Sequence, residues 1–98
     1  MADSTKRWDE EHPYYVDELG KYYHTFAQAR NALIERMCKW DSLKKDDYAF
    51  AYIHKRTKTS PLNQYAKIHG FREGNVIKFR IYYGSIEIKS MTLYKRVR

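Results

Sequence analysis

The chain has 98 residues and a formal net charge of +7. This length allows one domain with one core, and a hydrophobic content of 43% excludes the disordered class. The single cysteine excludes an intramolecular disulfide framework, and no apolar run reaches the length of a membrane-spanning helix. Because the N-terminus lacks the pattern of a signal peptide, we expect a cytoplasmic protein, or a nuclear one in a eukaryote.

The charge is divided unevenly between the two halves of the chain. Residues 1–52 hold 8 Lys and Arg against 10 Asp and Glu, a net charge of −2. Residues 53–98 hold 11 Lys and Arg against only Glu73 and Glu87, a net charge of +9. A basic half of this kind indicates a surface that meets a polyanion.

The first residues are expected to form two simple elements. Residues 1–12 are polar apart from Trp8, which predicts a loose N-terminal arm ahead of one compact domain over residues 13–98, with Trp8 as a candidate anchor. Residues 14–24 are rich in tyrosine and predict a β-hairpin, in which Gly20 takes the positive φ of a three-residue loop.

A long amphipathic helix should follow this hairpin. Thr25 and Gln28 have the spacing of a capping box, which marks a helix start. Cys38 lies beside the apolar stripe of this helix and is expected to be a small core residue rather than a nucleophile. The stripe itself consists of Phe26, Ala29, Leu33, Met37 and Trp40.

The middle of the chain predicts a strand and then a short helix. Residues 48–56 have the aromatic and β-branched content of a strand, although both of its faces carry apolar residues. Ser60-Pro61 offers a helix start and Gly70 a helix stop, so a second helix is expected over residues 61–69.

The C-terminal region predicts a basic hairpin. Residues 76–83 alternate in the manner of a strand, and Gly84-Ser85 has the pattern of a two-residue turn. The register set by that turn would place Arg80 opposite Lys89. Apolar residues then change frame, which predicts a bulge or bend near Ser90.

Taken together, these elements predict a single α+β domain. It would contain an N-terminal β-hairpin, one long amphipathic helix packed on an antiparallel sheet, a short second helix and a basic C-terminal β-hairpin. The basic hairpin would present a tyrosine-bearing sheet face, whose cations could position phosphates and whose tyrosine could stack a base. The candidate binding residues are Lys55, Arg56, Lys58, Lys78, Arg80, Tyr82, Lys89, Lys95, Arg96 and Arg98.

Two hypotheses about the partner of this face stay open. The first is a small non-enzymatic protein that binds nucleic acid, either DNA or RNA. The second is an accessory or inhibitor protein, of the kind that phages and mobile elements encode, which occupies an acidic groove on a protein partner. Composition does not separate these two classes.

Signals for catalysis and metal binding are weak. Glu87-Ile88-Lys89 has the E-x-K form of magnesium-dependent nucleases, but Asn75 occupies the place where such enzymes carry a second acid. A nuclease that uses Glu87 and Lys89 is therefore a minor hypothesis. No catalytic residue, metal or cofactor is expected, because no pair among the histidines has ligand spacing: His12, His24, His54 and His69.

Residues 60–89 resemble the swapped-hairpin AbrB-type DNA-binding pattern. In that pattern a proline-led short helix precedes a glycine and a G-(D/N) pair, with a second glycine between two strands. Gly74-Asn75 and Gly84 match this spacing. The chain departs from the pattern in a longer proline-to-glycine stretch and in Asn75 at the usual aspartate position. Its preceding strand also lacks the family's glycine and arginine. The resemblance implies a DNA-binding dimer.

Overall fold

The computed structural model describes residues 4–40, 43, 48–83 and 90–96, and it contains one helix and seven strands in that part of the chain. The helix is α1 (Phe26–Met37). The strands are β1 (Ser4–Thr5), β2 (Tyr14–Val16), β3 (Lys21–Tyr23), β4 (Tyr48–Lys55), β5 (Asn63–Glu73), β6 (Val76–Tyr83) and β7 (Ser90–Arg96).

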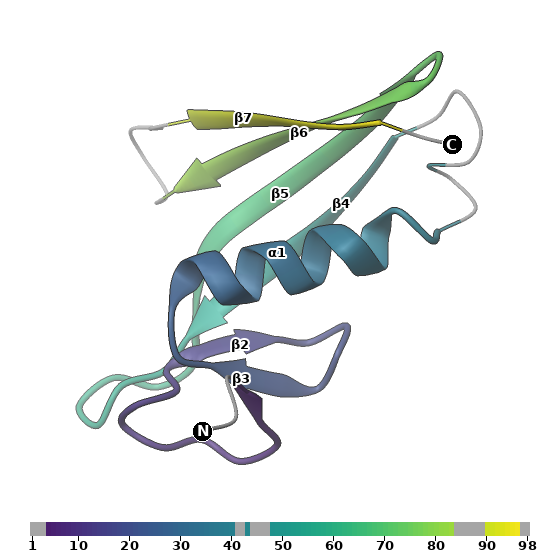
Figure 1. Cartoon of the computed structure of the whole chain (residues 1–98). Coiled ribbons are helices and arrows are strands. Elements are labelled where there is room, and N and C mark those ends of the chain that lie inside the picture. The colour runs from purple at the N-terminus through teal and green to yellow at the C-terminus, as the bar shows by residue number, and fades with distance from the viewer. Residues whose placement is uncertain (1–3, 41–42, 44–47, 84–89, 97–98) are drawn as a thin grey trace.

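All seven strands form one antiparallel sheet in the order β1-β3-β2-β4-β5-β6-β7. Figure 1 shows α1 lying across one face of this sheet. The core lies between the helix and that face, because alternate residues of β4, β5 and β6 are buried there. The buried strand residues are Ala51, Ile53, Ala66, Ile68, Ile77, Phe79 and Ile81.

The start of α1 is fixed by a local signal. The Thr25 hydroxyl accepts from the backbone N–H of Gln28 at 3.2 Å, and the Gln28 side chain accepts from the backbone N–H of Thr25 at 3.1 Å. This reciprocal pair is the predicted capping box, and it satisfies two N–H groups that a helix start leaves without partners. Of the predicted stripe, Ala29, Leu33 and Met37 are buried.

The predicted N-terminal hairpin is confirmed, with a longer loop than expected. Val16 pairs with Lys21, so four residues connect β2 to β3 instead of three. Gly20 has φ +62°, and its N–H donates to the Val16 carbonyl at 2.9 Å. Only glycine adopts this backbone conformation without strain.

The N-terminal segment contacts the sheet at several points. Ser4 and Thr5 pair with β3, which makes β1 the strand at one edge of the sheet. The Trp8 indole N–H donates to the Arg56 carbonyl at 2.8 Å. Through that bond Trp8 ties the segment to the end of β4.

The predicted second helix over residues 61–69 is wrong, and with it the two-helix α+β arrangement. These residues belong largely to β5, which pairs with β4 on one side and β6 on the other. The helical spacing of Leu62, Tyr65 and Ile68 coexists with an alternating pattern, and a helix this short has little intrinsic stability. Pairing on both sides satisfies more backbone groups, so the strand prevails.

Gly70 has a packing role rather than the predicted role of helix stop. It lies opposite Phe79 in the register of β5 and β6. A Cβ added at Gly70 would meet the Phe79 ring at 3.0 Å and Leu43 Cδ1 at 3.1 Å. The absence of a side chain at this position therefore lets the Phe79 ring lie close to the sheet.

The predicted register of the C-terminal hairpin is also wrong. Tyr82 pairs with Ser90 and Arg80 with Thr92, so Arg80 does not face Lys89. This register aligns the apolar positions of β7 with the buried row of β6, and a slip of one residue would move them to the other face. The apolar pattern of residues 90–96 thus outweighs the turn signal of Gly84-Ser85, which lies outside the described residues.

Candidate functional site

One face of the sheet carries no helix in the described part of the chain, and we call it the open face. Its side chains alternate along the strands with the buried residues that face α1. Cross-strand pairing arranges them in three rows. The rows are Tyr52–Lys67–Tyr82, then Phe50–His69–Arg80–Thr92, and finally Tyr48–Phe71–Lys78–Tyr94.

Exposed aromatic side chains are concentrated on the open face. In the described part of the chain, five large apolar side chains are exposed, and only Leu62 lies off this face. The other four are Tyr48 at 57%, Phe50 at 47%, Phe71 at 38% and Tyr94 at 66% exposure. Such a cluster marks an interaction surface more often than scattered single residues do.

Basic side chains lie between these rings. Lys67 Nζ is 4.8 Å from the centroid of the Phe50 ring, a cation–π contact. Lys78 and Arg80 line a shallow depression of about 190 Å³ with His69, Phe71 and Glu73. Among the described residues, Lys67, Lys78 and Arg80 make no ion pair with a carboxylate. Carboxylates of the described residues therefore leave the positive charge of these three side chains without an ion pair.

His69 responds to this positive environment. Its pKa is lowered from the ordinary value because partial burial, Lys67 and Arg80 all disfavour the imidazolium. His69 lies opposite Phe50 on one side and Arg80 on the other. An anion bound between these groups would raise the pKa of His69, because its negative charge favours the imidazolium form.

We expect an NMR titration to place the pKa of His69 below about 6.5, and Arg80→Gln to raise it. A bound polyanion should raise it too, so that binding takes up a proton and affinity increases as the pH falls through this range. Arg36→Gln, at an exposed position of α1, is the control that should leave the His69 pKa unchanged. An unaltered pKa in Arg80→Gln would contradict an electrostatic effect of Arg80 on His69.

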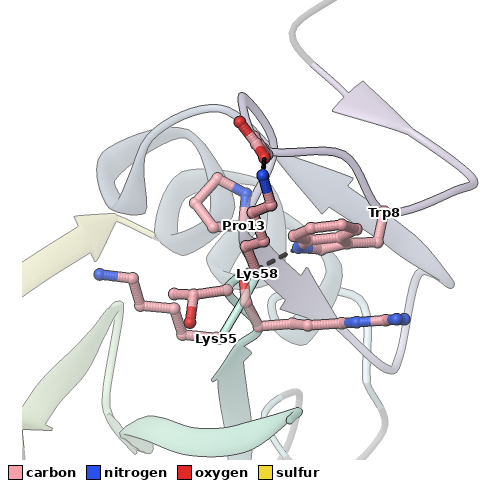
Figure 2. Close-up of a pocket in the computed structure, with 7 residues that line it drawn as sticks. Trp8, Pro13, Lys55 and Lys58 are labelled. Atoms are coloured by element: carbon pink, nitrogen blue, oxygen red, sulfur yellow. Dashed lines mark hydrogen bonds and ion pairs between the residues drawn. The ribbon is translucent and has the colours of Figure 1, made fainter. Parts of the chain in front are cut away.

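Three of the predicted binding residues lie at a second location. Lys55 ends β4, and Arg56 and Lys58 follow it. The three residues line a pocket of about 470 Å³ with Trp8, Glu10 and Pro13 (Figure 2). Lys55 lies five positions beyond Phe50 on β4, which puts it roughly 16 Å along the strand from the row of Arg80. The structure therefore does not bring these cations together with Lys78 and Arg80.

Each cation of this second location has a partner within the chain. The Arg56 guanidinium lies 4.8 Å from the Trp8 ring centroid, and Lys58 Nζ is 3.5 Å from Glu10 Oε1. Lys55 Nζ lies over two rings, 5.3 Å from Tyr14 and 5.5 Å from Tyr65. These contacts hold the N-terminal segment to the sheet, so the open face is the stronger candidate.

The remaining predicted residues divide into three groups. Lys95 pairs with Ile77, a position on the helix side, and its Nζ is 2.8 Å from Glu35 Oε1 of α1. This contact lowers the pKa of Glu35 and raises that of Lys95, although both groups are largely exposed. Arg96 is placed by its backbone opposite Val76. Glu87, Lys89 and Arg98 lie outside the described residues.

The sequence predicts only three residues in the rows of the open face: Lys78, Arg80 and Tyr82. The incorrect helix over residues 61–69 conceals the strand alternation of Lys67 and His69, and its expected stop at Gly70 separates Phe71 from them. Tyr48 and Phe50 were not assigned because apolar residues occupy both faces of β4. The alternation of Ala66, Ile68 and Gly70 with Lys67 and His69 is the signal that could have revealed the missing strand.

Other chemistry finds little support in the described part of the chain. Those residues contain no group of three His, Cys, Asp or Glu side chains able to hold a metal ion. Partial burial and the charge of Glu35 raise the pKa of the Cys38 thiol, so a smaller fraction of this thiol is ionised to the reactive thiolate. No described helix is long and apolar enough to cross a membrane.

Comparison of the chain with models of known protein families, with curated proteins and with solved structures gives no match. The AbrB-type resemblance also loses its first element, because β5 occupies the residues that would form the proline-led helix. The geometry of the open face is therefore the basis for a functional assignment.

Proposed function

We propose that the protein is a non-enzymatic nucleic-acid-binding protein and that the open face is its binding surface. The observation that carries this proposal is the set Lys67, Lys78 and Arg80. Lys78 stands between two exposed rings, Lys67 contacts the exposed Phe50 ring, and Arg80 lies in the row next to Lys78. No described carboxylate pairs with these three cations. Cations placed in this way can neutralise phosphates, while the neighbouring rings contact bases or sugars.

The charge of the surroundings supports the same proposal. Glu73 is the one carboxylate among the described residues that line the depression beside Lys78 and Arg80. Like charges near one another destabilise a free protein by a small amount. The pKa of His69 is lowered mainly by partial burial, and repulsion by Lys67 and Arg80 lowers it further. A polyanion would relieve this repulsion, which makes the free energy of binding more favourable.

The salt dependence of binding tests this proposal. If three cations contact phosphates, the logarithm of the binding constant should fall with the logarithm of salt concentration with a slope of about −2 to −3. A fourfold rise in salt would then weaken binding about fifteenfold to sixtyfold. Fluorescence anisotropy with labelled DNA and RNA oligonucleotides measures this slope.

A variant in which two cations of the open face are replaced by neutral residues tests whether this face causes the salt dependence of binding. Lys78→Gln with Arg80→Gln should reduce the magnitude of the slope by about 1 for each cation removed. The matched control is Arg36→Gln with Lys39→Gln, at exposed positions near the end of α1, and it should keep the wild-type slope. Binding that ignores salt, or an equal change in both variants, would refute the proposal. Binding to an acidic protein instead would favour the other partner class.

A further inference from the structure

We infer that the open face takes a single strand of nucleic acid, rather than a duplex, and that bases stack on its exposed rings. This inference rests on the proposed function and specifies its ligand. Four rings are available for stacking: Tyr48, Phe50, Phe71 and Tyr94. Bases of a single strand can turn outward and stack on aromatic side chains, whereas bases in a duplex are already stacked on one another.

Neighbouring side chains hold two of these rings in place. The Phe50 ring has Lys67 Nζ 4.8 Å from its centroid and the Tyr52 ring edge-on at 5.9 Å. The Tyr48 ring lies 5.6 Å from the His69 ring. Because rings that are already ordered lose little conformational entropy on binding, these contacts prepare the surface for stacking.

The shape of the open face does not fit a duplex groove. Its rows cross four strands, from β4 to β7, a width of about 14 Å between the outer strands. The major groove is about 12 Å wide and admits one helix or a two-stranded ribbon. The described helix, α1, lies on the opposite side of the sheet and cannot enter a groove at the open face.

Cations and rings alternate in a way that suits an extended strand. In the row Tyr48–Phe71–Lys78–Tyr94, Lys78 stands between two exposed rings. In the adjacent row, Arg80 lies between His69 and Thr92. A nucleic-acid strand that crosses these rows could stack its bases on the rings. Its phosphates would then lie beside the neighbouring cations.

The test compares a single strand with its own duplex. A fluorescein-labelled DNA of about 15 nucleotides and mixed sequence would be titrated with the full chain, alone and annealed to its complement. An RNA strand of the same sequence is titrated in parallel, and it shows whether the protein binds single-stranded DNA or RNA more tightly. At about 0.1 M salt, we expect the single strand to bind at least tenfold more tightly than the duplex.

Ring variants separate stacking from charge. Phe71→Ala and Tyr94→Ala should each weaken single-strand binding about fivefold or more while the salt slope stays unchanged. Leu62→Ala removes an exposed apolar side chain off the open face and should bind as the wild type does. Circular dichroism verifies that each variant is folded.

The possible failures are distinguishable. Equal or tighter binding of the duplex, or wild-type affinity of both ring variants, would overturn the single-strand inference. The proposed function would survive that result if the salt slope still depended on Lys78 and Arg80. Absence of salt-dependent binding to every oligonucleotide would overturn both.

Discussion

The Phe79→Ala variant is expected to lose about 3–5 kcal/mol of unfolding free energy. Phe79 has no exposed surface, and its ring fills the space left by the missing side chain of Gly70. Removing it leaves a cavity in the core over β5 and β6, next to Leu43. Since small domains are stable by only about 5–15 kcal/mol, this loss would leave the fold marginal.

Urea denaturation followed by circular dichroism measures this effect, with Phe71→Ala as the control. Phe71 is the same residue type on the neighbouring strand, but it lies on the open face with 38% of its surface exposed. Replacing Phe71 with Ala should lower the unfolding free energy by less than about 1 kcal/mol. Equal destabilisation by the two variants would contradict the assignment of the two faces of the sheet.

Reversing the charge of two open-face cations, in Lys78→Glu with Arg80→Glu, is expected to weaken nucleic-acid binding by about a hundredfold or more. Each substitution removes one phosphate contact and adds repulsion at the same place. Neither residue belongs to the buried core, so the fold should persist. Fluorescence anisotropy at low salt gives the affinity, and circular dichroism gives the fold.

Arg36→Glu with Lys39→Glu is the matched control for charge reversal. It changes the net charge by the same amount at exposed positions of the helical region. Long-range attraction falls equally in both proteins, whereas local contacts fall only in the open-face variant. Similar losses in the two variants would mean that net charge, and not the open face, determines binding.

Local signals were sufficient for several elements. The capping box of Thr25 and Gln28 predicted the start of α1, because both of its hydrogen bonds form within four residues. Gly20 predicted the first turn, since only a positive φ was required there. The alternation of residues 76–83 predicted β6 and the shared face of Lys78, Arg80 and Tyr82.

Non-local pairing decided the elements that were predicted incorrectly. Residues 61–69 carry both helical and alternating patterns, and the backbones of β4 and β6 on either side select the strand. The β6–β7 register depends on which apolar positions meet across the sheet, and a turn signal alone does not establish this. The same register carries Lys95 to the helix side, where Glu35 contacts it.

The sequence by itself determined that the positive charge belongs to the second half and that one strand carries Lys78, Arg80 and Tyr82 on a single face. Only the tertiary structure decided which cations share a surface. Strand pairing adds Lys67 to that face, while Trp8 and Glu10 engage Arg56 and Lys58 elsewhere. The reason is physical: alternation is a property of neighbouring residues, whereas the neighbours of a charge are set by pairing between distant segments.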